Sequence, residues 1–319
     1  MMKRGRKVMT YDVKAPYDVH VGFGPMFELL SSLHTFICRK AYKKTDLSSG
    51  WAEQVRGKLS PGLSELLDSM EINADWKVIY GLVCMLSDEG GSDEVIDRLE
   101  SRTARELHEQ ALAYGIPLSE DMEKLRSLAL RLLPGWYEEY FRYTDANILI
   151  GLGQEAEQRN KEKDTYSTLE WVDRITNGFQ FEPSDGLTRI LLVPHYHFQP
   201  LNIIYRFGSL LLCHYSAGIY FQEDDFLSPQ EYRMIRSLGE KSRLKILKYL
   251  HQSDAPRTFI EIVRHLKLSK GITHDHIFKL RASGFIHAHF DSETLLGYSS
   301  RLSAVNEIHS SILGYMERK

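Results

Sequence analysis

The chain has 319 residues, of which 43% are hydrophobic and 26% are charged, and its formal net charge is −3. This composition is ordinary for a globular protein, and the length allows two domains, each with its own core. No apolar run approaches the roughly 18 residues of a membrane-spanning helix, and no apolar segment follows the basic N-terminus as in a secretory signal. The three cysteines are far apart and form no CxxC pair, which favours reduced thiols in a cytoplasmic protein.

The first two-thirds of the chain predict a mainly helical domain that contains a small sheet. An alternating strand at 17–24 precedes helical patterns that recur through the next hundred residues, and Pro134-Gly135 is expected to end the amphipathic helix at 119–133. Residues 152–166 are strongly polar and are interpreted as a solvated helix or loop. Short segments rich in β-branched or aromatic residues then predict further strands, at 188–194, 202–207, 209–214 and 218–222.

A domain boundary is predicted near residue 228, where an acidic run at 223–225 is followed by the helix start Ser228-Pro229. This divides the chain into a domain at 1–227 and a domain at 228–319. From residue 230 onward there are 15 Lys or Arg against 9 Asp or Glu, so the C-terminal module is basic while the rest is acidic. A basic module on an acidic body is expected if only the module meets a polyanion.

The C-terminal module has the element order of a winged helix-turn-helix. Helical patterns and two alternating strands follow one another, with helices at 230–238, 242–250, 258–266, 270–282 and 304–316 and strands at 285–290 and 295–300. In such a module the helix after the tight turn enters the major groove of DNA, and the hairpin lies over the adjacent backbone. The predicted fold class is therefore mainly α with small β elements (α+β).

Three segments of this module resemble the ArsR-like winged helix-turn-helix regulators: 237–250, 260–269 and 277–286, with the patterns xxRLxILxxL and LSxxxxxxHIxxLRxxGFI. The resemblance covers about ninety residues, and the part before it resembles the large extension that some bacterial ArsR-like proteins carry. It implies a homodimer formed through the helices at 230–238 and 304–316. The paired cysteines of many metal sensors of this group are absent here, so metalloid sensing is not expected.

The N-terminal part of the helix at 270–282 is expected to read DNA bases. Lys270 and His274 can donate to purine acceptors or to phosphates, and Asp275 can accept from cytosine N4. Gly271 is interpreted as allowing the backbone to approach DNA closely. Ser269 is a predicted cap, beside N–H groups that suit a phosphate. For each residue the alternative is solvent exposure without DNA contact.

Further basic residues are expected to meet the phosphate backbone. Lys279 and Arg281 lie later in the same helix and are assigned to phosphate. Arg243 lies near the start of the helix at 242–250, where it either binds phosphate or braces a neighbouring carboxylate.

The predicted wing is only weakly basic. Asp291 and Glu293 at its tip are unfavourable beside phosphate, and Arg301, with His287 and His289, is the partial compensation. Arg301 is therefore included among the predicted DNA contacts.

His195 and His197 are the best metal candidate, because residues two apart on a strand share a face. His214 or Asp224 would supply a third ligand, and the alternative is a pair of exposed or hydrogen-bonded histidines. The second interpretation is preferred, so no metal is predicted, and no cofactor is predicted either.

No catalytic motif of the GxSxG, Walker, HExxH or GxGxxG kind occurs, so the chain is not expected to be an enzyme. The aromatic residues at 136, 137, 140, 141 and 143 either line a ligand pocket or form core.

Together these features predict a cytoplasmic transcriptional regulator that binds duplex DNA as a homodimer. Its N-terminal domain would sense a small-molecule effector or set the geometry of the dimer. Two alternatives belong to other classes of protein: a winged helix that binds protein instead of DNA, and a His-dependent metal enzyme in the N-terminal domain.

Overall fold

A computed structural model describes residues 17–88, 94–117, 121–221 and 226–318. Helices form most of its first part, and a lobe of them surrounds α1. The helices of this lobe are α1 (Pro25–Ile37), η1 (Arg39–Lys44), α2 (Ser48–Arg56), α3 (Pro61–Ser69), α4 (Ala74–Asp88), α5 (Val95–Ser101), α6 (Ala104–Tyr114), α7 (Met122–Glu139) and η2 (Phe141–Tyr143). Three more follow them, α8 (Ala146–Lys161), η3 (Lys163–Thr165) and α9 (Thr168–Thr176).

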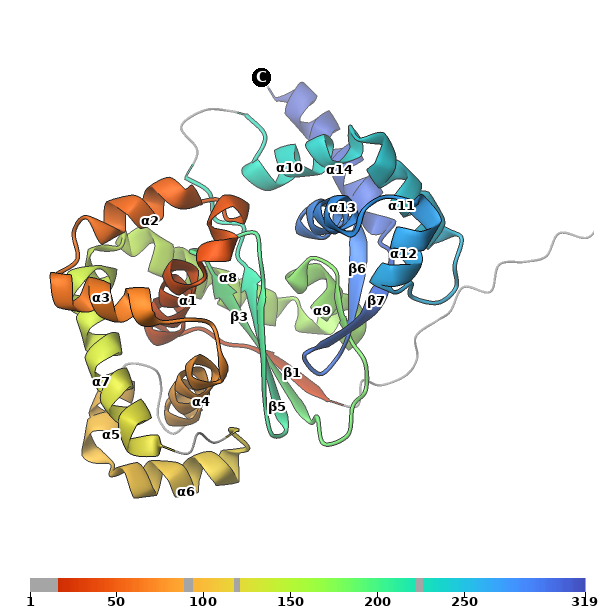
Figure 1. The fold of residues 1–319 in the computed structure, drawn as a ribbon. Coiled ribbons are helices and arrows are strands. Elements are labelled where there is room, and N and C mark those ends of the chain that lie inside the picture. The colour runs from red at the N-terminus through yellow and green to blue at the C-terminus, as the bar shows by residue number, and fades with distance from the viewer. Residues whose placement is uncertain (1–16, 89–93, 118–120, 222–225, 319) are drawn as a thin grey trace, which may run out of the picture.

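A four-stranded sheet separates this lobe from the rest of the molecule (Figure 1). Its order is β1-β3-β5-β4, with β1, β3 and β5 parallel and β4 antiparallel to β5; the strands are β1 (Asp18–Val21), β3 (Arg189–His195), β4 (Ile203–Phe207) and β5 (Leu210–Ser216). Alternate residues of a strand face opposite sides. Val193 and Leu212 accordingly pack with the helical lobe, whereas Ile190 and Leu211 pack into a second core.

The second core is shared by the other face of the sheet and the C-terminal module. That module consists of α10 (Pro229–Leu238), α11 (Lys241–His251), α12 (Phe259–Leu266), α13 (Lys270–Ala282), β6 (Ile286–Asp291), β7 (Thr294–Ser300) and α14 (Ser303–Glu317). Ser228 and Thr258 form the capping boxes that start α10 and α12. The predicted order of helices and strands in this module is confirmed, and so is the mainly α fold class.

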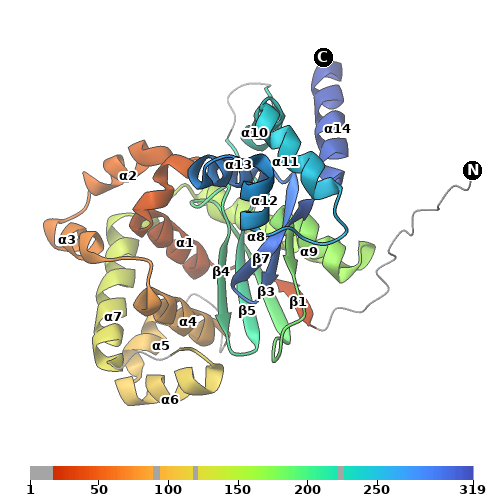
Figure 2. The same ribbon diagram turned by 45° about the vertical axis from the view of Figure 1, so that its right-hand side comes forward.

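A strand from the first part of the chain extends the wing. β2 (Phe179–Phe181) pairs in parallel with β6, so that Phe179 lies opposite Ala288 and Phe181 opposite Phe290. The resulting sheet has the order β2-β6-β7. In Figure 2 the wing strands stand beside the larger sheet, and α13 lies toward the helical lobe. The winged helix is therefore joined to the body by backbone hydrogen bonds as well as by side chains.

Several local expectations were wrong. α7 continues through Pro134 to Glu139, because Leu133 and Trp136 on either side of the proline are buried and hold the helix in place. Residues 218–221 form no strand, and Gln222 lies outside the described residues. For the polar segment at 152–166, by contrast, the helix alternative is confirmed as far as residue 161, where α8 ends. None of the described helices combines the length and the apolarity that crossing a bilayer requires.

Candidate nucleic-acid interface

The turn between α12 and α13 has the geometry of a helix-turn-helix. α12 ends at Lys267, which adopts the left-handed conformation at φ 56°. Two residues later the Ser269 hydroxyl accepts the backbone N–H of Ile272 at 3.3 Å and so caps α13. The predicted role of Ser269 as a cap agrees with this contact.

The first half of α13 presents an exposed polar face. Lys270, Gly271, His274 and Asp275 are exposed, while Thr273 on the opposite face is buried. A side chain at Gly271 would meet no protein atom within 4 Å, so packing inside the protein does not require glycine there. These four residues lie where a recognition helix contacts base edges.

The second half of α13 faces the body of the protein instead. Phe278 packs against the core of the helical lobe, and the Lys44 ammonium lies 4.9 Å from the centre of its ring. Lys279 donates to Asp275 at 2.7 Å, so these two predicted contacts neutralise one another. The Arg281 guanidinium lies over the ring of Phe179 on β2, at 5.9 Å from its centre. Arg281 therefore faces the cleft between α13 and the body of the protein and not the outer face of α13, and its contact with DNA phosphate stays a prediction.

Arg243 braces backbone rather than a carboxylate. Its Nε donates to the carbonyl of Ser237 at 2.7 Å, and one terminal nitrogen donates to the carbonyl of Arg236 at 3.0 Å. These carbonyls belong to the last turn of α10, where a cation is favourable. The contact holds α10 against α11.

Arg301 is buried and is not a wing contact. Only 3% of its side chain is exposed, and it donates to Asp173 at 3.0 Å, to Glu307 at 3.1 Å and to the carbonyl of Gly284 at 3.2 Å. Burial alone would raise the pKa of Asp173, but the hydrogen bond from His287 and the charge of Arg301 outweigh it and lower that pKa. The DNA contact predicted for Arg301 is thus corrected: its partner lies 128 residues away, which no local pattern reveals.

The wing itself is held by the body. His289 contacts Glu182 at 3.2 Å, and Glu293 at the tip pairs with Lys77 of α4 at 2.5 Å. With one edge paired to β2 and its tip paired to α4, the hairpin does not project freely into solvent. The candidate interface is therefore centred on α12 and α13 and not on the wing.

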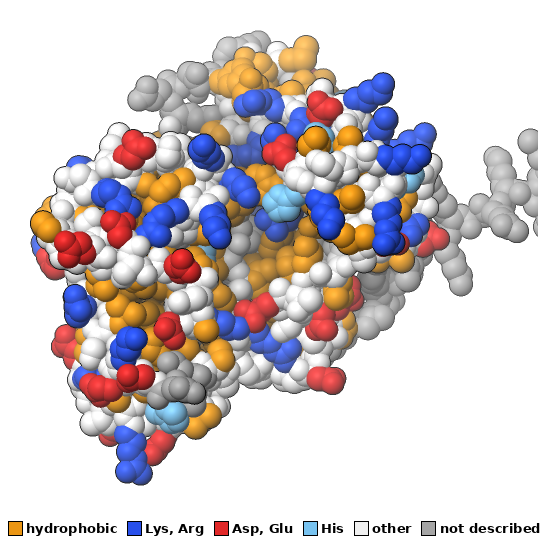
Figure 3. Space-filling view, in the orientation of Figure 1, with side chains coloured by type: hydrophobic (Ala, Val, Ile, Leu, Met, Phe, Trp, Pro, Cys, Tyr) orange, Lys and Arg blue, Asp and Glu red, His pale blue; other side chains and the backbone are white. Residues whose placement is uncertain are grey.

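Basic side chains also come from the body. Figure 3 shows Lys and Arg on both sides of the hollow between the helical lobe and the winged helix, above an apolar floor. On the lobe side, Lys40 and Lys44 of η1 are exposed and line this hollow together with His274 and Arg281. The sequence did not predict Lys40 and Lys44 as part of this site, because nothing in their segment indicates that it lies opposite α13.

A second, larger cavity lies in the helical lobe and encloses about 950 Å³. Tyr140 and Tyr143 line it, as does Trp51, whereas Trp136 and Phe141 of the same aromatic set are buried core and Tyr137 is 43% exposed. The aromatic set thus divides between the two predicted alternatives.

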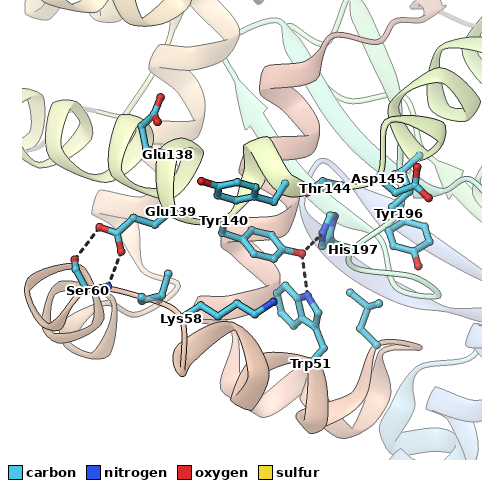
Figure 4. A pocket seen from close by; sticks show the side chains of 14 residues that line it. Trp51, Lys58, Ser60, Glu138, Glu139, Tyr140, Thr144, Asp145, Tyr196 and His197 are labelled. Carbon is cyan, nitrogen blue, oxygen red and sulfur yellow. Dashed lines mark hydrogen bonds between the residues drawn. The ribbon is translucent and has the colours of Figure 1, made fainter.

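One wall of this cavity is held by a chain of hydrogen bonds (Figure 4). The buried carboxylate of Glu28 accepts from the backbone N–H groups of Tyr196 and His197 and from His197 Nδ1 at 2.6 Å. His197 Nε2 lies 2.7 Å from the Tyr140 hydroxyl, which also accepts from Trp51 Nε1 at 2.9 Å. These hydrogen bonds fix the orientation of the rings of Tyr140 and Trp51.

His195 and His197 do not converge on one point. His195 Nε2 lies 2.8 Å from the carbonyl of Leu201, and its Nδ1 accepts the N–H of Phe198, whereas His197 contacts Glu28. Within the part of the chain that the structure describes, no three His, Cys, Asp or Glu side chains could hold a metal ion. Asp224, a predicted third ligand, lies outside the described residues.

Comparison with known proteins identifies the module but not the body. No significant match was found among curated proteins or among solved structures. Residues 240–288, which run from the start of α11 into β6, match the family model described as bacterial regulatory protein, arsR family. Residues 240–288 of the C-terminal module therefore form an ArsR-family helix-turn-helix domain.

Proposed function

We propose that the protein is a cytoplasmic transcriptional regulator that binds duplex DNA sequence-specifically as a homodimer, with a sensory N-terminal domain and no catalytic step. The observation that carries the proposal is the first half of α13. This part of the helix lies in an ArsR-family helix-turn-helix domain and exposes four residues outside the core: Lys270, Gly271, His274 and Asp275.

DNA binding is tested by fluorescence anisotropy on pooled genomic duplex fragments, titrated across salt concentrations. We expect affinity to fall steeply with salt, because bound Lys and Arg displace counterions from phosphate. Lys270→Ala/His274→Ala should weaken binding by about 10- to 100-fold and abolish the preference among fragments.

A matched control removes the same side-chain types elsewhere. His20 on β1 and Lys124 on α7 are exposed, so His20→Ala/Lys124→Ala should bind DNA like the wild type. Absence of binding at low salt by the folded wild type would contradict the proposal. It would favour a winged helix that binds protein, for which the apolar side chain of Ile272, 51% exposed on α13, is the supporting observation.

The homodimer is supported by an exposed apolar stripe on α14. Val305, Ile312 and Met316 are 46%, 36% and 73% exposed and recur at helical spacing along one face. We expect Val305→Glu/Met316→Glu to be monomeric by light scattering at a concentration where the wild type is dimeric. Leu112→Glu, at a 58% exposed position on α6, is the control. A monomeric wild type would contradict this part of the proposal.

The sensory role is supported by the 950 Å³ cavity and its fixed aromatic wall. Trp76, Trp136 and Trp171 are at most 1% exposed, so Trp51 is the tryptophan that a ligand in this cavity would touch. A small-molecule screen followed by tryptophan fluorescence should find compounds whose signal disappears in Trp51→Phe. Hits that keep their signal in Trp51→Phe would place their site elsewhere.

A further inference from the structure

Among the described residues, only cationic and neutral side chains line the hollow between η1 and α13. This inter-module cleft encloses about 380 Å³. Lys40 and Lys44 line it from the body, and His274 and Arg281 line it from the winged helix. No Asp or Glu is found among the described residues that line it. Because basic side chains on protein surfaces usually lie near acidic ones, such a one-signed cavity calls for an anion.

Arg281 carries this argument furthest. Its side chain is half-buried, burial lowers the pKa of the guanidinium, and no carboxylate in the described part of the chain pairs with it. Its guanidinium lies over the face of Phe179. A desolvated cation without a counter-charge is costly, and an anion entering the cleft would remove that cost.

The floor of the cleft supplies a neutral donor and apolar surface. Trp76 Nε1 donates to His34 Nδ1 at 3.1 Å, and burial lowers the pKa of His34 to about 3. The imidazole is therefore neutral near pH 7 and carries its proton on Nε2, which makes it a donor. Phe198 and Ile203 beside it are apolar and buried. Donors surround the cleft, and a group with several anionic oxygens matches them best.

We propose that the inter-module cleft binds a phosphate group between Lys40 and Lys44 of the body and Arg281 of the winged helix. The phosphate has two sources, a free phosphate-bearing small molecule or the DNA backbone beside α13. In the second case the inference rests on the DNA-binding function proposed above. In either case the ligand would bridge the two modules, so its binding would depend on how they are placed.

The two sources are separated by two measurements on the full chain. Calorimetry without DNA uses inorganic phosphate and phenyl phosphate as probes, with benzyl alcohol as the probe that lacks the phosphate. Salt-dependent anisotropy measures DNA binding. Both compare the wild type with Lys40→Gln/Lys44→Gln, which changes two exposed side chains outside the helix-turn-helix. Lys124→Gln/Lys161→Gln, on α7 and α8, makes the same change of charge away from the cleft and should behave as the wild type.

Phenyl phosphate that binds the wild type, and binds Lys40→Gln/Lys44→Gln at least about 10-fold more weakly, would identify a free ligand. A salt slope reduced by about 1.8 in that variant, from about 0.9 for each lost phosphate contact, would identify DNA phosphate. The inference is overturned if both phosphate probes fail to bind and the salt slope of the variant equals that of the wild type. Calorimetry needs no DNA, so failure of the DNA-binding function would leave the first arm intact.

Discussion

Basic side chains occur both on the exposed face of α13 and in the seam, where the winged helix packs against the rest of the protein. Their roles in these two places differ. On the exposed face, Lys270 and His274 have no partner of opposite charge in the described structure and contribute little to the core. In the seam, Arg301 is enclosed by Asp173 and Glu307, and Arg281 lies over Phe179. Polar groups on the face should therefore affect DNA binding and leave stability unchanged, while the buried ion pairs of Arg301 should do the reverse.

The largest expected effect comes from buried histidines. Burial lowers the pKa of His34 and of His195 to about 3 and that of His214 well below its usual value of 6.5. Since the unfolded chain then binds more protons below about pH 6.5, the free energy of unfolding should fall as the pH drops. Three such groups would contribute at most about 4 kcal/mol per pH unit. Urea unfolding between pH 7.5 and 5 measures this slope.

Two variants sharpen that comparison. His214 lies among Phe27 and Tyr80, so His214→Phe should fold and reduce the slope by about a third. His274→Phe, on the exposed face, should leave the slope unchanged. Equal slopes in His214→Phe and the wild type would show that the buried histidines do not govern the acid sensitivity.

Arg301→Ala should have the next largest effect. It would leave Asp173 buried beside His287 without its guanidinium, at a cost of about 3–5 kcal/mol in the free energy of unfolding. Lys270→Ala should change that free energy by no more than about 0.5 kcal/mol. Both values come from urea denaturation at pH 7.5. If Arg301→Ala kept full stability and instead weakened DNA binding, the seam and the face would have exchanged roles.

Gly271→Ala should have the smallest effect on stability and the opposite sign. Alanine is the better helix former by about 0.5–1 kcal/mol, and its Cβ would meet no protein atom within 4 Å. Denaturation should therefore show a slightly more stable protein. If the backbone at residue 271 approaches DNA, anisotropy should show weaker binding at the same time. A variant that gains stability without losing affinity would separate Gly271 from the interface.

The sequence predicted the winged helix well because its signals are local. Ser228, Thr258 and Ser269 are caps whose partners lie three residues away, and the apolar spacing between them defines each helix. The role of Arg301 was assigned wrongly because its partner Asp173 lies 128 residues earlier in the chain, and the contact of Arg281 with Phe179 was not predicted for the same reason. The position of a residue in the module predicts which helix or strand carries it, but tertiary packing decides what its side chain contacts.

The body was predicted less completely for the same reason. β2 has only three residues, and its partner β6 is more than a hundred residues later, so no periodicity marks it as a strand. Pro134 was taken as a helix end because local propensity disfavours it, whereas the burial of Leu133 and Trp136 keeps α7 continuous. Likewise, Glu28 and Trp51 belong to the cavity wall through His197 and Tyr140, which the chain brings from distant segments.

The pairing of β2 with β6 has a consequence for handling the protein in pieces. A fragment that begins at residue 228 would lack β2 and would leave the outer side of β6 as an open edge strand, with unpaired N–H and C=O groups next to Phe290. Such an edge is a template for pairing with another copy, so the isolated winged helix should associate through β6, a contact that β2 blocks in the whole chain. A fragment that also carries residues 168–181 would need the residues between 181 and 228 as well, because they connect β2 to the winged helix. The whole chain is therefore the natural unit for study.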